Sequence, residues 1–174
     1  MMVSKEHAAI AQLETAIWLY FEDKDPISVH TLANAAGEAL DGCCTAAGQE
    51  SMWAAFRNHI KPEFWEEIRN KIREPYNHFK HSSNAHQSIY FTDDQNVFFL
   101  FRACMNARTL SFDSDFCGIF ITWLAAVEPQ WLLQLPDPNG AIRAAYGDIL
   151  LLPREVQKGR GRAIIEITKR TFQS

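Results

Sequence analysis

The side chains best suited to chemistry gather between residues 73 and 81, in the order Arg-Glu-Pro-Tyr-Asn-His-Phe-Lys-His. The spacing of the neighbouring apolar residues predicts a helix, and on a helix residues four apart lie one above another. Arg73, Asn77 and His81 therefore form one polar stripe. A guanidinium holds a phosphate through two N–H groups, and an imidazole transfers protons near neutral pH. The stripe thus carries the groups needed to cleave a phosphodiester without a metal ion.

Two further residues of this cluster are secondary candidates. His78 lies about a quarter-turn from Asn77, so it joins the stripe only if the helix is kinked. We expect such a kink at Pro75, because proline lacks an N–H group and crowds the preceding turn. Lys80 is a candidate binding residue beside His81. The predicted inward face of the helix consists of Phe64, Ile68, Ile72 and Phe79.

The same cluster resembles a motif of the HEPN superfamily of small helical proteins. Arg73 followed by four residues and His78 is similar to the Arg-x4-6-His pattern of that superfamily. Asn77 to His81 resembles the Asn-x3-His part of its commonest form, with Tyr76 where that form has an arginine. The two registers are alternatives. In the second, Arg73 would have to replace the missing arginine from one turn earlier.

The chain also resembles a group of uncharacterised bacterial proteins, through His30-Thr-Leu-Ala and Asn77-x-Phe-Lys-His81, over roughly residues 8–110. The HEPN resemblance implies a metal-independent endoribonuclease, often a toxin or an anti-phage effector, that works as a dimer. Histidine would serve as acid or base and arginine would stabilise the developing negative charge. Other members have lost this chemistry and bind partners or nucleotides. The implied partners are RNA, a protein such as an antitoxin, and a second copy of the chain.

The cluster also has an interpretation without catalysis. A helix C-terminus favours a histidine such as His81, and the Asn77 side chain can bond the carbonyls freed by Pro75. Arg73 can pair on the surface with the neighbouring acidic residues Glu66 or Glu74. We therefore favour a non-catalytic interaction or sensor domain in a bacterial stress or defence context. A ribonuclease that uses Arg73 and His81 is the first alternative and a weak histidine-based metal-binding protein the second, and whether the protein is an enzyme stays open.

Other reactive side chains give weaker indications. His78, His81 and His86 suggest a metal site, but no nearby Asp or Cys completes a ligand set, so we expect no metal and no cofactor. His30 is a candidate binding residue if its helix borders the cluster, although a lone histidine is more often packed. The cysteines form no C-x-x-C pair and lie in apolar surroundings, which predicts buried thiols; they are Cys43, Cys44, Cys104 and Cys117.

The sequence pattern predicts that the elements carrying these residues are helices. Apolar residues recur with helical spacing over residues 4–22, 26–47, 62–79, 93–110 and 115–127. The expected end signals are Ser4 and Asp93 or Asp94 as N-caps, first-turn prolines at 26 and 62, and a stop at Gly48. The helix from Phe98 to Leu110 is apolar on nearly every face and should be central. Strand signals are confined to residues 88–91 and 163–168, and the second of these fits a helix equally well.

Length and composition agree with one all-α domain over residues 1–174, a bundle of five or more helices. We place its core at roughly 4–127, followed by a basic extension at 128–174 that prolines 136, 138 and 153 interrupt. The longest run without Asp, Glu, Lys or Arg is 12 residues, too short for the ~20 of a membrane span. Neither a membrane span nor a signal peptide is indicated, so we expect a cytoplasmic protein without a membrane partner.

The uneven charge along the chain and one stretch of small residues suggest which partners the protein could bind. Residues 1–50 carry eight acidic and two basic residues, whereas residues 154–170 carry six basic and two acidic ones. Such a basic end suits a polyanion, but it is also typical of a solvated tail, which we favour. The Ala-rich stretch at 26–47 suits close packing of helices. Together with the HEPN resemblance, it predicts a homodimer formed through the helices that flank the 73–81 cluster.

Overall fold

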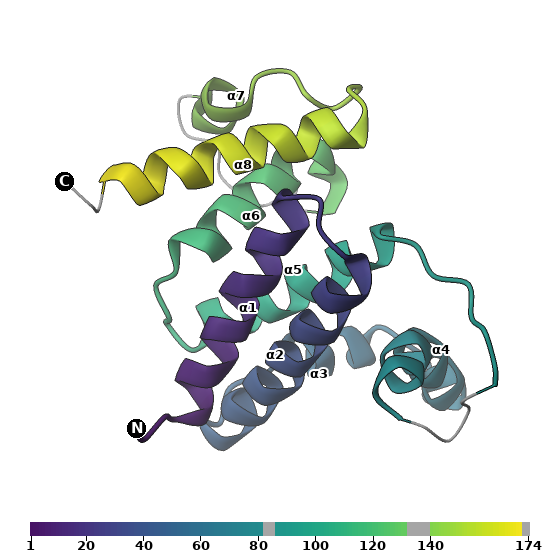
Figure 1. Cartoon of the computed structure of the whole chain (residues 1–174). Coiled ribbons are helices and arrows are strands. Elements are labelled where there is room, and N and C mark those ends of the chain that lie inside the picture. The colour runs from purple at the N-terminus through teal and green to yellow at the C-terminus, as the bar shows by residue number, and fades with distance from the viewer. Residues whose placement is uncertain (82–85, 132–139, 172–174) are drawn as a thin grey trace.

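A computed structural model describes residues 1–81, 86–131 and 140–171 (Figure 1). Within these ranges all regular structure is helical, which confirms the all-α prediction. The elements are α1 (Lys5–Phe21), α2 (Pro26–Ala46), α3 (Met52–Asn58), α4 (Pro62–Lys80), α5 (Asp94–Thr109), α6 (Asp115–Val127), the 3-10 turn η2 (Pro129–Trp131), α7 (Ala141–Tyr146) and α8 (Arg154–Thr171).

Local signals place most helix ends where we expected them. The Ser4 hydroxyl accepts the His7 N–H at 3.2 Å and begins α1. Pro26 and Pro62 are the first residues of α2 and α4. Gly48 follows the end of α2 with a φ of +69°, a conformation that glycine adopts without strain. Capping chemistry therefore divides this part of the chain into its helices.

Three elements differ from the prediction. Helix α3 was missed, although Ser51 marks its start by accepting the Ala54 N–H at 3.2 Å. Helix α7 was missed as well. Residues 88–91 form no strand, whereas residues 163–168, which fitted a strand or a helix equally well, belong to α8. The breaks expected at prolines 136 and 138 lie outside the described residues.

Helix α5 is the centre of the molecule, as its sequence predicted. It packs against α1, α2, α3 and α6, and its fully buried side chains include Leu100 and Cys104. The hairpin of α1 and α2 lies along it (Figure 1). The core also takes in Tyr146, Ile149 and Ile165, beyond the boundary at residue 127 that we expected. All four cysteines are buried, as predicted, and none forms a disulfide.

The small residues of α2 serve packing within the chain. Ala33 and Ala36 are fully buried, and the backbone of Gly37 lies against the guanidinium of Arg102 from α5. That guanidinium pairs with Asp41 and lies 4.8 Å from the centre of the Trp53 ring. Since α1 and α5 already cover these small residues, they lend no support to a homodimer, which stays a prediction from the resemblance alone.

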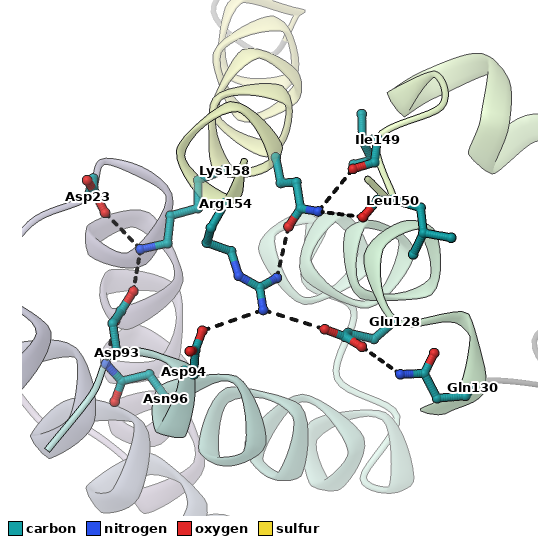
Figure 2. A network of polar contacts seen from close by, with 11 residues as sticks. Asp23, Asp93, Asp94, Asn96, Glu128, Gln130, Ile149, Leu150, Arg154 and Lys158 are labelled. Carbon is teal, nitrogen blue, oxygen red and sulfur yellow. Dashed lines mark hydrogen bonds and ion pairs between the residues drawn. The ribbon is translucent and has the colours of Figure 1, made fainter. Parts of the chain in front are cut away.

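The basic end of the chain is a helix fastened to the bundle by its charges (Figure 2). Arg154, Lys158 and Arg162 are spaced by four and so share one face of α8. Lys158 Nζ donates to Asp23 Oδ1 at 2.8 Å and also bonds Asp93, and it lies 4.3 Å from the centre of the Tyr20 ring. The hydrogen bond from Lys158 lowers the pKa of Asp23 below its ordinary value.

The two neighbouring cations of α8, Arg154 and Arg162, also have partners on other elements. Arg154 lies 3.5 Å from Glu128 and 3.6 Å from Asp94, as Figure 2 shows. Arg162 Nε donates to the Phe21 carbonyl at 3.1 Å and lies 3.8 Å from Glu22. The expectation of a solvated tail was therefore wrong for these residues, because carboxylates after α1, at the start of α5 and at Glu128 pair with them.

None of the helices within the described ranges combines the length and apolarity that a membrane span requires.

Close packing of α8 on α1 gives a first prediction. A Cβ atom added at Gly161 would lie 2.2 Å from Cε1 of the fully buried Phe21 ring, whereas one at Gly159 would meet nothing within 4 Å. We expect Gly161→Ala to lower the free energy of unfolding by about 1–3 kcal/mol through overpacking. Gly159→Ala should raise it by up to about 1 kcal/mol, since alanine favours helix. Urea denaturation measures both, and equal stability of the two variants would contradict the contact.

The charges of α8 give a second prediction. The Lys158 side chain is only 4% exposed and holds two carboxylates, so we expect Lys158→Ala to cost about 2 kcal/mol of unfolding free energy. Arg160 lies on the exposed face of the same helix, and Arg160→Ala should change stability by less than about 0.5 kcal/mol. Thermal unfolding of the two variants beside the wild type separates them. A Lys158→Ala variant as stable as the wild type would show that the buried ammonium does not fasten α8.

Candidate functional site

Helix α4 carries the predicted cluster at one edge of the molecule, away from α8 (Figure 1). It packs mainly against α2. Its most buried side chains are Trp65, Pro75 and Tyr76, and the helix continues through Pro75 to Lys80. Phe64 is 50% exposed, so its placement on the inward face was wrong. Trp65 takes that position because α3, which the sequence reading missed, supplies aromatic partners for it.

Those partners fix the N-terminal half of α4. The Trp65 ring lies 5.3 Å from Trp53 and 6.5 Å from Phe56, measured between ring centres. Arg57 lies 5.7 Å from the centre of the same ring. Farther along α4, Ile72 packs against the core, as expected. The helix is thus held by one aromatic cluster at its start and by apolar contacts along its length.

Arg73 points toward α2 and forms an ion pair with Glu38. Both side chains are about one-third exposed. The surface partners that we considered are not used: Glu66 lies 2.7 Å from Arg69 instead. Arg73 therefore has a fixed partner on another helix, which a reading of α4 alone does not reveal.

Tyr76 and Lys80 lie on the same side of α4 as Arg73, three and seven residues farther along. Tyr76 is buried, and the Lys80 ammonium lies 5.1 Å from the centre of its ring. This arrangement is a cation–π contact. Lys80, a predicted binding residue, thus packs over the Tyr76 ring. It does not line the hollow that Asn77, His78 and His81 share.

Asn77, His78 and His81 line one hollow of about 620 Å³ beside α4. His78 is therefore grouped with the other two, where the sequence required a kink to bring it in. Arg73 is not part of this lining. The hollow is completed by Asn70, Lys71, Glu74, Gln87 and Ile89. Three of the four predicted catalytic residues share a site, and the guanidinium on which phosphate chemistry depends lies outside it.

A second, larger hollow adjoins the first. It measures about 790 Å³ and shares Lys71, Glu74 and Ile89 with the polar hollow. Its walls are mainly apolar and come from α3, α4, α5 and the extended segment 86–91; they include Phe56, Ile72, Pro75, Tyr90, Phe98 and Phe99. We call the two hollows together the α4 groove. The sequence did not predict its apolar half, because α3 was not predicted and residues 88–90 form no regular element.

His30 does not line the α4 groove. It is fully buried, and its Nδ1 lies 2.9 Å from Asn96 Oδ1. Its ring is surrounded by Phe79, Phe91 and Phe99 at centre distances of 5.8, 4.9 and 4.7 Å. Burial lowers the pKa of His30, and the bond to Asn96 acts in the opposite direction. The packed interpretation of His30 fits this surrounding, and the residue lies behind the groove rather than in it.

The side chains of the groove offer hydrogen bonds, apolar contact and, through Lys71 and Glu74, charge. Asn70, Asn77 and Gln87 supply carboxamides, and His78 and His81 supply imidazoles. In the described part of the chain, no group of three His, Cys, Asp or Glu side chains is placed to hold a metal ion. His86 is exposed and is not part of the lining.

Comparison with known proteins adds no relative: no protein-family profile, curated protein or solved structure matches this chain. The HEPN resemblance therefore stays a prediction, and the function must be argued from the groove itself.

Proposed function

We propose that the protein is a non-catalytic sensor or interaction domain that binds a small amphipathic molecule in the α4 groove. The observation that carries this proposal is the adjacency of an apolar and a polar hollow that share Lys71, Glu74 and Ile89. Sites for small molecules commonly combine apolar walls with a few polar groups that fix orientation.

The apolar half supplies the binding free energy. Aromatic side chains of α3 and α5, among them Phe56, Phe98 and Phe99, line it together with Ile72 and Pro75 of α4. Transfer of apolar surface from water into such a hollow is worth about 25 cal/mol for each Å² buried. Its volume of about 790 Å³ lies within the usual range for small-molecule sites.

The polar half supplies orientation. Its carboxamide and imidazole groups donate and accept hydrogen bonds, and the Lys71 ammonium stands where the two halves meet. Among the described residues Lys71 takes part in no ion pair, whereas the nearby Arg69 and Arg73 are paired. Lys71 is therefore the cation that a negatively charged ligand head would meet.

The position of Arg73 favours binding over catalysis. Metal-free cleavage of a phosphodiester needs a cation at the phosphate beside the acid and base. Arg73 is held by Glu38 of α2 and is not among the residues that line the hollow, and Tyr76, at the position of the motif arginine, is buried. A homodimer and a cytoplasmic location, which follow from the resemblance and from the composition, are part of the proposal but independent of the groove.

Binding can be tested with 1-anilinonaphthalene-8-sulfonate, a probe with an aromatic body and an anionic head. We expect saturable binding to the native protein, and Lys71→Ala should weaken it about tenfold, the effect of losing one charge-assisted contact of ~1.4 kcal/mol. Lys80→Ala is the matched control, because Lys80 lies over Tyr76 outside the groove. Fluorescence titration gives both dissociation constants. Equal weakening by the two variants, or no binding by the wild type, would contradict the proposed groove.

The ribonuclease alternative retains one supporting observation, the shared hollow of Asn77, His78 and His81. Because Arg73 is absent from it, we expect purified protein to leave mixed RNA intact with or without EDTA, and His81→Ala to behave like the wild type. Gel analysis of the RNA after incubation measures this. Cleavage by the wild type in EDTA that His81→Ala lowers by about 10²–10⁴-fold would establish the ribonuclease instead.

A further inference from the structure

The buried ring of His30 joins three elements that are separate in the sequence. Phe79 comes from the last turn of α4, Phe91 from the extended segment 86–91, and Phe99 from α5. All three rings meet the imidazole nearly at right angles, with interplanar angles of 77–88°. His30 thus lies where α4 and the extended segment are held against the central helix.

The hydrogen bonds of Asn96 determine where the His30 proton lies. Asn96 Nδ2 donates to the Pro26 carbonyl at 3.0 Å and to Asp93 Oδ1 at 2.8 Å, so the opposite atom, Oδ1, must be an acceptor. His30 Nδ1 therefore carries the proton and donates to Asn96 Oδ1 at 2.9 Å. Nε2 keeps its lone pair and has no hydrogen-bond partner among the described residues.

A second proton on this ring would be poorly accommodated. It would place an N–H donor on Nε2 among phenyl rings with no acceptor, and it would bury a charge. The titratable groups closest to the arrangement do not compensate. Asp93, which accepts from Asn96, already binds Lys158. His78 contacts Phe79, with 5.8 Å between the two ring centres, but within the described residues its ring does not contact that of His30.

We propose that His30 is an acid-sensitive latch: when neutral it holds the end of α4 and the segment 86–91 on α5, and when protonated it releases them. These two elements also form walls of the α4 groove, so acid would change the groove as well. The latch itself does not depend on the proposed function; only its effect on ligand binding rests on it.

The direction and size of the effect follow from proton linkage. Above an ordinary histidine pKa of about 6.5 the ring is neutral in both the closed and the released states. Below it, the released state gains a proton first, because burial lowers the pKa in the closed state. From pH 7.5 to pH 5.5 the equilibrium constant for release therefore rises by at most about tenfold, the limit set by a ring that stays neutral in the closed state.

Hydrogen exchange in the full chain tests the latch. The readout is the set of amides in the last turn of α4, residues 77–81, of which the His81 N–H bonds the Asn77 carbonyl at 3.0 Å. After correction for intrinsic exchange, their protection should fall by up to about tenfold between pH 7.5 and pH 5.5. Protected amides of α6 should not change.

Three variants assign the response. His30→Phe keeps a ring among the three phenylalanine side chains, and His30→Asn keeps a donor to Asn96. Neither replacement titrates, so both variants should lose the acid response whatever their stability at pH 7.5. His78→Gln removes the rival histidine and should keep the response. An unchanged protection in the wild type, an equal fall in α6, or a response lost only in His78→Gln would each overturn the latch. If the acid response is found but the fluorescent probe does not bind, the latch is confirmed and the proposed function is wrong.

Discussion

The ammonium of Lys158 is the contact on which the architecture depends. It lies inside the protein and joins α8 to the turn after α1, through Asp23, and to the start of α5, through Asp93. A buried cation is tolerated only where carboxylates and hydrogen bonds replace its water. Asp93 also accepts a hydrogen bond from the Asn96 side chain. The same side chain donates to the Pro26 carbonyl and is hydrogen-bonded to His30. One connected set of polar contacts thus sets the positions of four helices.

The candidate site lies at the far end of this set. The start of α5 is fixed by Asp93 and Asn96, and the next turn of that helix carries Phe98 and Phe99, which line the apolar hollow. Helix α4, the opposite wall, is held in a different way, by Trp65 against α3 and by Arg73 against Glu38. The groove therefore has one firmly anchored wall and one wall with fewer attachments, an arrangement suited to adjustment around a ligand.

Local chemistry in the sequence was enough to find the main helices. Ser4, Pro26 and Gly48 act within a few residues of themselves, so their effects can be read from the chain alone. The partners of Arg73 and Lys158 are 35 and 135 residues away, and no local pattern names them. For this reason the sequence identified Arg73 and Lys158 as charged residues but did not reveal the carboxylates that pair with them.

Fastening the first helices to the last one has a consequence for biosynthesis. A chain made from its N-terminus has Asp23 and Asp93 outside the ribosome well before Lys158 is translated. During that interval the turn after α1 and the start of α5 lack their cation, and the Phe21 ring lacks the cover of Gly161. The hairpin of α1 and α2 can form early from local contacts, but the native arrangement is completed only after α8 emerges. Until α8 emerges, the apolar surface that it covers in the folded protein is therefore exposed to non-native contacts.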